Sequence, residues 1–525
     1  MATKYIFVGE ESRTALKTGI NTITDPIALS LGVKGKCIVL HSKLGNFISK
    51  DGYTISKAID LVNEIEKIGA GFVKEVAKKT VDEAGDGTTS VSVLFREIVN
   101  EGFKQVTAGG SSINLKSGID KAVMAVVDNI KSMSKKVETT SKELIQVATI
   151  AANNDLVLGE MIADVYAKIG EHGQVHVKDS KSFNTYSDVV EGYQFERGLI
   201  SPHFVNRIEE LTCELHNPYV LVYEGTINRW NDIGLLMKSI FEQKRSLLII
   251  AEDFDSETVQ NLIANKERGG FAVALVKSPS FGDTRKEMME DISVITGATY
   301  ISEERGYKLS EINLTHFGNC SEIHITKDQT TIIKGNGSKT AIEARVNRIM
   351  TQISQAKSIP EETMQKERLS KLKGGLAVIY VGAVSETEIS EKKDRIDDAV
   401  RATKAAIEEG VVAGAGTTLI RSISVLDTIE CANDEEKTGV SIIKKSLESV
   451  LRQICKNAGD DESYIVRQVK EATGNIGYNA KTGTIEDLVE SGILDASKVV
   501  RVAFENAASV AATLITTDCL VVNTD

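Results

Sequence analysis

The middle of the sequence differs in pattern from its two ends. Three compact apolar segments, YVLVYEG (219–225), SLLIIAEDF (246–254) and FAVALVKSP (271–279), are separated by stretches long enough for one helix each. Strands buried in a parallel sheet form continuous apolar runs, and parallel strands need crossover helices between them. We therefore predict an α/β domain in the middle of the chain.

The two ends are predicted to be mostly helical. Apolar residues recur at helical spacing over 61–76 and 91–103, and helical patterns return from about residue 387. A chain of 525 residues is too long for a single hydrophobic core. The economical fold is a multidomain α and α/β protein, in which both ends build a helical domain and the α/β domain is inserted between them.

Several shorter elements can also be predicted. The segments KCIVLH (36–41) and NFISKDGY (46–53) are expected to be short strands around a turn, and EIHITKDQTTIIKG (322–335) a hairpin. One charged helix is expected over about 338–373. The terminal segments KYIFV and CLVV are apolar strand-formers whose free edges need partners. Pairing within the same subunit and pairing with a neighbouring subunit's hairpin carry equal weight.

Composition narrows the classes of function. The net charge of −12 argues against binding to nucleic acid or to an anionic membrane, because phosphate groups select basic surfaces. No apolar run reaches about 18 residues, and the first residues lack the pattern of a signal peptide. A cytoplasmic location is therefore expected. His172 and His176 flank a predicted turn into a strand, which argues against a helical metal-binding pair.

The segment AGDGTTS (84–90) interrupts two predicted helices with small and oxygen-bearing residues. The N-terminus of a helix attracts anions, and glycines let the backbone approach a phosphate closely. Asp86 would repel a phosphate directly, but it suits Mg²⁺, which bridges carboxylate and phosphate oxygens. A simple helix-capping turn is the more common use of such a motif.

Further loops strengthen the case for a nucleotide site. Glycine-bearing turns occur at SLGVKGK (30–36), SKDGYT (49–54) and GAG (414–416), although no P-loop or dinucleotide fingerprint is present. Asp397 and Asp398 are adjacent on a predicted helix, so one can face inward while the other stays in solvent. A carboxylate near bound ATP can position or activate the attacking water.

The motifs GDGTT, SLGVKG, KDG, IDDAVRATKAAIEEGVVAGAG, GYNA and GILDASKV occur in the order and spacing of group I chaperonins, which this chain resembles over nearly its whole length. The resemblance implies an equatorial ATPase domain (1–133 and 409–525), an intermediate hinge domain (134–190 and 376–408) and an apical substrate-binding domain (191–375). In this sequence Ala415 stands where such proteins usually have a glycine.

The resemblance also assigns roles within the equatorial site. Asp51 and Asp398 would act on the hydrolytic water, Asp86 would bind Mg²⁺, and backbone oxygens of Ser30 and Lys50 would bind K⁺. The residues implied in ATP binding are Ser30, Leu31, Gly32, Lys50, Asp86, Gly87, Thr88, Thr89, Ser90, Ile150, Gly414, Ala415, Asn479, Ala480 and Asp495.

In the apical domain the resemblance implies an apolar surface that captures non-native polypeptides. Its residues would be Leu199, His203, Phe204, Met237, Val259, Ile263 and Ala264, with Gly234 where a leucine is usual. Glycines at the seams between domains are candidate hinges, or else residues that only end strands and helices: Gly192, Gly374, Gly375 and Gly410.

The implied function is that of an ATP-dependent chaperonin that folds client polypeptides inside a ring cavity. The implied partners are non-native clients, a co-chaperonin lid, and further copies of the chain in a sevenfold single or double ring. One alternative is a ring-forming holdase or scaffold with weakened cycling or lid dependence. A second alternative is an enzyme that uses ATP to activate a small metabolite.

Overall fold

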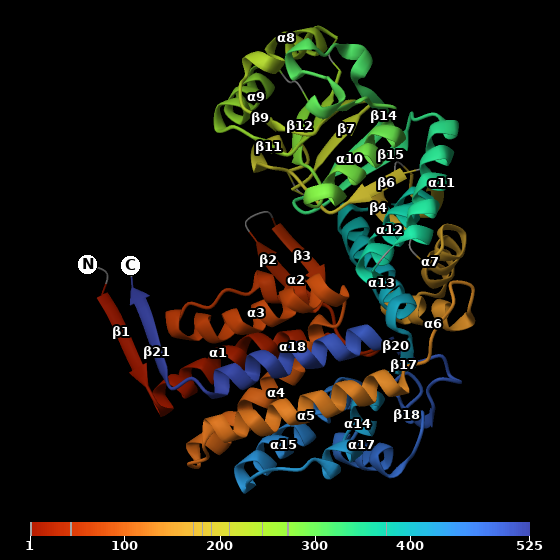
Figure 1. Ribbon diagram of the computed structural model, residues 1–525. Helices are drawn as coiled ribbons and strands as arrows, with labels where there is room; N and C mark the ends of the chain where they lie inside the picture. The colour runs from red at the N-terminus through yellow and green to blue at the C-terminus, as the bar shows by residue number, and fades with distance from the viewer. Residues whose placement is uncertain are drawn as a thin grey trace. The chain divides into compact units, whose positions relative to one another are not determined.

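The computed structural model describes residues 3–42, 45–171, 173–180, 182–190, 192–208, 211–243, 245–269, 272–356, 358–373 and 375–524 (Figure 1). The chain divides into two compact units. Unit 1 comprises Met1–Ala167, Val177–Tyr186 and Tyr380–Asp525, and unit 2 comprises Lys168–His176 and Ser187–Ile379. The predicted α/β insertion between helical ends is confirmed, whereas the boundaries of three domains stay a prediction.

Unit 1 is mostly helical. Its helices are α1 (Glu10–Ala28), α2 (Gly52–Ala58), α3 (Glu64–Ala84), α4 (Thr88–Thr107), α5 (Ser112–Met133), α6 (Lys142–Ala151), most of α7 (Leu156–Ile169), α13 (Glu386–Glu409), α14 (Thr417–Arg421), α15 (Asp434–Ser446), α16 (Ser449–Ala458), α17 (Glu462–Glu471) and α18 (Ser497–Ile515). The break predicted at AGDGTTS separates α3 from α4.

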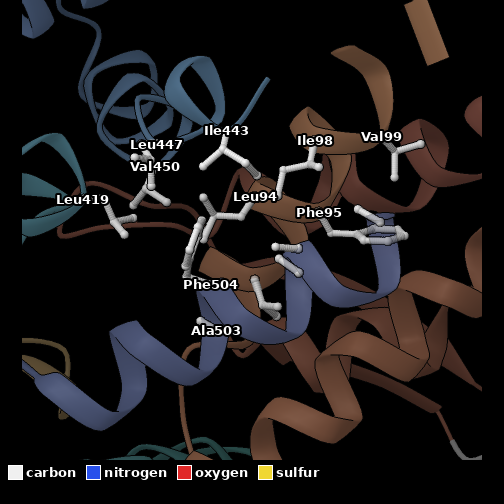
Figure 2. Close-up of a cluster of buried hydrophobic side chains, with 14 of the residues drawn as sticks. Leu94, Phe95, Ile98, Val99, Leu419, Ile443, Leu447, Val450, Ala503 and Phe504 are labelled. Carbon is white, nitrogen blue, oxygen red and sulfur yellow. The ribbon is translucent and has the colours of Figure 1, made fainter. Parts of the chain in front are cut away.

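Helix α18 comes from the far end of the chain and packs against α3, α4 and α5. In Figure 2, Phe504 and Ala503 of α18 lie beside Leu94 and Phe95 of α4. All four side chains are buried in one core that also holds residues of α14, α15 and α16. Burial of this apolar surface joins the two ends of the sequence into one unit.

Short strands complete unit 1. The terminal strands β1 (Thr3–Val8) and β21 (Cys519–Thr524) pair antiparallel, so the termini lie side by side (Figure 1). Strands β2 (Ile38–Ser42) and β3 (Gly45–Ser49) form the predicted hairpin. Two further pairs are β17 (Val411–Ala413) with β20 (Leu494–Ala496), and β18 (Ile476–Asn479) with β19 (Thr484–Asp487).

Unit 2 is built on an eight-stranded sheet whose main path runs β12-β10-β8-β14-β15-β6. Its strands are β6 (Gly192–Phe195), β7 (Cys213–His216), β8 (Tyr219–Tyr223), β10 (Leu247–Ala251), β12 (Val273–Lys277), β13 (Tyr300–Ile301), β14 (Gly318–Ile325) and β15 (Thr330–Gly335). The three predicted apolar segments are the parallel strands β8, β10 and β12. Strands β14 and β15 are the predicted hairpin.

Both faces of this sheet are buried. Along β8, Val220 and Val222 belong to one apolar core, whereas Leu221 and Tyr223 belong to another on the opposite face. Because side chains on both faces of the sheet are buried, polar and apolar residues do not alternate along these strands. The helices of unit 2 are α8 (Asn231–Glu242), α9 (Ser256–Gly269), α10 (Gly282–Thr296), α11 (Lys339–Gln355) and α12 (Ile359–Lys373). A short parallel pair joins β9 (Thr226–Ile227) to β11 (Asp253–Phe254).

The single helix predicted over 338–373 is wrong, because the chain forms α11 and α12 there. Helix α11 ends at Gln355, and Ala356 has an extended conformation (φ −58°, ψ 133°). Pro360 is the second residue of α12. Proline lacks the N–H that a helix interior requires but is tolerated in a first turn, so the helix restarts around it.

Along the chain, three strands each contain one of the boundaries between the two units. They are β4 (Gln174–Asp179), β5 (Tyr186–Val190) and β16 (Leu376–Val381), in the sheet order β4-β16-β5. Strand β4 includes the QVHV part of the segment EHGQVHV, where the sequence predicts entry into a strand, and His172 lies outside the described residues. In the part of the chain that the structure describes, no helix has the length and apolar character needed to cross a membrane.

Candidate functional site

Unit 1 contains a pocket of about 680 Å³ that is lined by loops and helices from both ends of the sequence. This volume lies within the range typical of small-molecule sites. Its walls come from residues 30–33, 49–52 and 86–90, from α6 and α13, and from residues 413, 415–416, 418–419, 478–481 and 491–496. The pocket therefore gathers all the loops that the sequence marked as glycine-bearing.

The first wall is the loop after α1. Gly32 has φ +83°, a left-handed conformation that favours glycine. The Ser30 hydroxyl donates to the carbonyl of Ile27 and lies 3.4 Å from the Thr89 hydroxyl. From α16, Asn457 Nδ2 donates to the carbonyl of Leu31 at 2.9 Å. These bonds hold the loop beside the start of α4.

The second wall is the GDGTTS segment. Gly85 and Gly87 have φ +80° and +91°, which turn the chain sharply between α3 and α4. No side chain caps the first turn of α4, whose N-cap is Gly87. The N–H groups of that turn are thus available to an anion, and the helix dipole favours negative charge there. Asp86 Oδ1 accepts from the Gly87 N–H.

Asp51 links the third loop to this helix start. Its carboxylate caps α2 by accepting from the Tyr53 and Thr54 N–H groups, and it also accepts from the Thr88 hydroxyl at 3.1 Å. A Cβ on Gly52 would lie 2.6 Å from Thr89 Oγ1. Glycine is needed here because any side chain would push the two loops apart.

Helix α13 contributes three acids to the pocket. Glu391, Asp394 and Asp398 line it, whereas Asp397 is not among the described residues of its wall. Residues four apart share one face of a helix, and adjacent residues point about 100° apart. The sequence-based prediction that one of the paired acids faces inward therefore fits Asp398.

The acids of the pocket perturb one another. Burial, followed by the charges of Asp86 and Asp51, raises the pKa of Asp398 well above its ordinary value. Burial also raises the pKa of Asp86, with a contribution from Asp51. The pKa of Asp394 rises to about 6 through burial and the nearby Asp51 carboxylate, and that of Asp495 to about 6 through burial and the nearby Asp86 carboxylate.

Such a cluster fits a cation with a preference for oxygen ligands. Carboxylates and hydroxyls are the donor set of Mg²⁺, and like charges that raise each other's pKa are relieved by a divalent ion. Asp86 fits this role best, because it stands at the helix start where a phosphate would lie. Lys50 also lines the pocket, and burial lowers the pKa of its ammonium. The K⁺ site at Ser30 and Lys50 stays a prediction.

The remaining wall is formed by the C-terminal part of unit 1. Ala415 has φ +54°, a strained conformation for a residue with a side chain. Its N–H donates to the Asp495 carboxylate. Gly414 does not line the pocket, but a Cβ there would lie 3.1 Å from Asp495 Oδ1. Asn479 binds Glu486 through Nδ2 and the Lys481 N–H through Oδ1.

The structure thus brings together every predicted nucleotide residue except Gly414, which stands behind the wall. Ile150 of α6 and Ala480 also line the pocket. Sequence reasoning missed Asp394, Glu391 and Arg395, which line it as well. The signal was available, because positions 391, 394 and 398 recur at helical spacing on one face of α13. The individual roles of these residues stay predictions.

The residues predicted to bind polypeptides are divided between core and surface. Phe204 and Met237 are 0% and 5% exposed and belong to a core of unit 2, which contradicts their expected place on an open surface. Leu199, Val259 and Ile263 are half-buried against that core. Ala264 and Gly234 are also half-buried, and His203 is exposed.

The candidate hinge glycines that the structure describes have close neighbours. Gly410 ends α13 with φ +85°, and a Cβ there would lie 2.4 Å from the Lys135 carbonyl oxygen. A Cβ on Gly375 would lie 3.0 Å from Cγ2 of Ile169. Gly192 opens β6, where a Cβ would lie 2.5 Å from Leu376. Gly374 lies outside the described residues. The hinge role of all four stays a prediction.

Comparison with known proteins assigns this arrangement to a family. The model of the TCP-1/cpn60 chaperonin family matches residues 23–525. Two crystal structures of the chaperonin gp146 from the bacteriophage EL 2 (Pseudomonas aeruginosa), both obtained in the presence of ATP-BeFx, share the fold. One matches with a TM-score of 0.75 and the other with 0.68, each at 19% identity and over 99% of both chains.

Proposed function

The chain belongs to the TCP-1/cpn60 chaperonin family, and from that premise we propose that it hydrolyses ATP to drive the folding of non-native polypeptides. The observation that carries the proposal is the convergence of Asp51, Asp86 and Asp398, from three distant parts of the sequence, on one pocket at an uncapped helix start. A purely structural pocket would not need carboxylates placed so that their charges raise the pKa of Asp86 and Asp398.

The proposed chemistry begins with the triphosphate. The N–H groups of the first turn of α4 and the hydroxyls of Thr88, Thr89 and Ser90 would bind its oxygens. Bound Mg²⁺ would neutralise phosphate charge, held by Asp86. Asp51 and Asp398 would orient the attacking water and accept its proton, as acids do in other phosphoryl transfers. Because Asp398 lies on α13 and Asp51 before α2, hydrolysis requires both elements in place.

Assembly into a ring is part of the proposal. Ile6 and Val8 of β1 and Val521 of β21 are 63%, 60% and 53% exposed, although all three are apolar. Val39 and Ile48 of the β2–β3 hairpin are exposed as well. Pairing of the two-stranded ribbon of one subunit with the hairpin of the next would cover both surfaces. A ring of subunits, sevenfold in one or two layers, would be closed by such contacts.

The client surface is proposed to consist of half-buried apolar residues rather than fully exposed ones. Val259 and Ile263 are four apart on α9 and share a helix face with access to solvent. Their contact with a client would be apolar and without directional bonds, which suits capture of many unfolded chains. A co-chaperonin lid would compete for the same surface.

We expect the variant Asp398→Ala to separate binding from hydrolysis. Turnover of ATP should fall by about 100-fold or more, because general-base assistance is lost. Affinity for ATP should stay within about threefold, since the phosphates are held at α4 and by the ion on Asp86. Single-turnover hydrolysis and equilibrium binding of a fluorescent ATP analogue measure the two properties.

The matched control is Asp397→Ala, which removes the adjacent acid of the same helix and should leave turnover near that of the parent protein. Equal loss of binding and turnover in Asp398→Ala would contradict the assigned role. Absence of any ATP binding by the parent protein would overturn the proposed function as a whole.

A second candidate is a ring-forming holdase or scaffold with weakened cycling. It is favoured by the burial of Phe204 and Met237, which reduces the apolar surface offered to clients. Refolding of a stringent client, measured with and without a co-chaperonin and ATP, separates the candidates. ATP-dependent recovery of native client supports the folding machine, whereas stable client capture without recovery supports the scaffold.

A further inference from the structure

A compact cluster of imidazoles and carboxylates lies in unit 2, on strands β7 and β14. In their antiparallel pairing, Glu214 is opposite His324, and His216 is opposite Glu322. Side chains two residues apart on a strand point to the same face, so all four share one face of the pair. The intervening Leu215 and Ile323 belong to the apolar core on the other side.

The distances within the cluster suit metal ligation. One ligand atom from each of Glu214, His216 and Glu322 lies within 4.8 Å of the others. His216 Nδ1 is 3.9 Å from Glu322 Oε1. The ligand atoms of a tetrahedral zinc ion lie about 2.1 Å from the metal and therefore about 3.4 Å from one another. A small side-chain movement would bring the three ligand atoms to that spacing. His216 can make that movement, since its side chain is 69% exposed.

A buried histidine points to a ligand at the same place. His324 is 6% exposed, and its Nδ1 has no hydrogen-bond partner in the part of the chain that the structure describes. That nitrogen lies 3.6 Å from Glu214 Oε1. The ring of His324 also lies 4.3 Å from that of His176 on β4. Buried polar atoms without partners are rare in native proteins, and carboxylates that bind a metal are usually oriented by hydrogen bonds from a neighbouring group.

Two hydrogen bonds to Asn206 hold the backbone of Glu214 in place. Asn206 accepts from the Glu214 N–H at 2.9 Å and donates to the Glu214 carbonyl at 2.7 Å. Arg207 contacts the carboxylate at Oε2, 3.1 Å away, which leaves Oε1 on the side of His324. The Glu214 carboxylate therefore already has one cationic partner, Arg207. The Glu322 carboxylate and the His216 ring face each other on the side of the cluster that is open to solvent.

We propose that Glu214, His216 and Glu322 bind a divalent transition-metal ion of the zinc class, with His324 as the residue that orients Glu214. Imidazole together with carboxylate suits such ions, whereas Mg²⁺ and Ca²⁺ prefer oxygen ligands alone. The ion would join β7 to β14 across the sheet of unit 2. The proposed metal site lies in unit 2 and is distinct from the pocket of unit 1, whose described lining has acids but no histidine.

The test is calorimetric titration of the full-length protein with zinc chloride, without nucleotide and in excess Mg²⁺, which occupies oxygen-only sites. We expect one zinc ion per chain at this site. The variants His216→Ala and Glu322→Gln should each weaken its affinity by at least about tenfold, and His324→Ala by about 10–100-fold. The matched control is His203→Ala, which removes another exposed histidine of unit 2 and should leave zinc affinity unchanged.

A second readout uses Co²⁺ as a probe of geometry. Intense visible absorption, lost in His216→Ala, supports a site of low coordination number that contains this imidazole. Zinc should also raise the thermal midpoint of the parent protein and not that of the variant. Zinc affinity that is the same in the parent protein, His216→Ala and Glu322→Gln would overturn the proposal, and so would Co²⁺ absorption unaffected by His216→Ala.

Discussion

At the scale of single residues, Ala415 is the clearest case of local strain at the pocket of unit 1. Its φ of +54° places a side chain in the left-handed region, which costs about 1 kcal/mol for a residue other than glycine. The position is held because the Ala415 N–H donates to Asp495 and the next residue, Gly416, is the N-cap of α14. Strain of this kind marks sites whose backbone geometry matters more than their stability.

We expect Ala415→Gly to stabilise unit 1 by about 0.5 kcal/mol, because relief of strain exceeds the added entropy of the unfolded chain. The control is Ala413→Gly in β17. The φ of Ala413 is ordinary, so this change should destabilise unit 1 by about 1 kcal/mol. Urea denaturation followed by circular dichroism measures both. Destabilisation of similar size in the two variants would show that position 415 carries no strain.

The carboxylates of the pocket predict how stability depends on pH. The ordinary pKa of Asp394 is 3.8, and in the folded protein it is raised to about 6. Between these values the folded chain holds a proton that the unfolded chain has lost. The associated stabilisation is complete below the unfolded pKa and disappears as the pH rises through about 6.

Without nucleotide or divalent ions, the free energy of unfolding should therefore decrease between about pH 4 and about pH 6. The variant Asp394→Asn should reduce this decrease, because amide and carboxyl differ in charge only above the pKa. Urea midpoints across the pH range, with Mg²⁺ present and absent, measure the effect. A pH profile identical in parent and variant would mean that Asp394 does not titrate in this range.

At the scale of elements, pairs of glycines let the helices of unit 1 approach closely. A Cβ on Gly118 of α5 would lie 2.1 Å from the Glu436 carbonyl oxygen of α15, and one on Gly439 of α15 would lie 2.2 Å from the Leu115 carbonyl oxygen of α5. The two helices contact through backbone at both points. Any side chain there would force them apart.

We expect Gly118→Ala to destabilise unit 1 by about 1–3 kcal/mol through overpacking. The matched control is Gly71→Ala, since Gly71 lies on α3 with open space around it. There, alanine should stabilise by about 0.5–1 kcal/mol through its higher helix propensity. Thermal unfolding of both variants gives the comparison, and equal effects of the same sign would contradict the close approach of α5 and α15.

At the scale of the whole molecule, exposed apolar strands at the termini are the strongest indication of assembly. An unpaired strand edge is an aggregation hazard unless something covers it. We expect Ile6→Lys to reduce ring formation, because a charge on β1 would be buried in the proposed contact. Electron microscopy and sedimentation velocity, with and without ATP, measure the fraction of assembled rings.

The control for that experiment is Val62→Lys, which adds the same charge at a residue of unit 1 that is 97% exposed and lies outside the terminal ribbon and the hairpin. It should assemble as the parent protein does. If Ile6→Lys assembles equally well, the ring contact lies elsewhere. If the parent protein is a monomer under all conditions, the proposed ring is wrong.

The sequence by itself determined several of the helices and strands in each unit, because periodicity reports burial on one face or on two. The apolar runs of β8, β10 and β12 and the glycine turns around α4 belong to this class. Its motifs also marked the glycine-bearing loops that line the pocket of unit 1, but not most of the other lining residues. It did not predict the break between α11 and α12, where one proline outweighed good helix propensity over the rest of the segment.

Only the tertiary structure decided which side chains meet. Phe204 and Met237 are apolar, and apolar character alone does not tell a client-binding surface from a core. Asp394 comes near Asp51 only when α13 packs against β3, the strand that precedes Asp51. Glu214 meets His324 only through the register of β7 and β14. Such contacts depend on residues far apart in the chain, whose pairing is set by the packing of whole elements rather than by any local pattern.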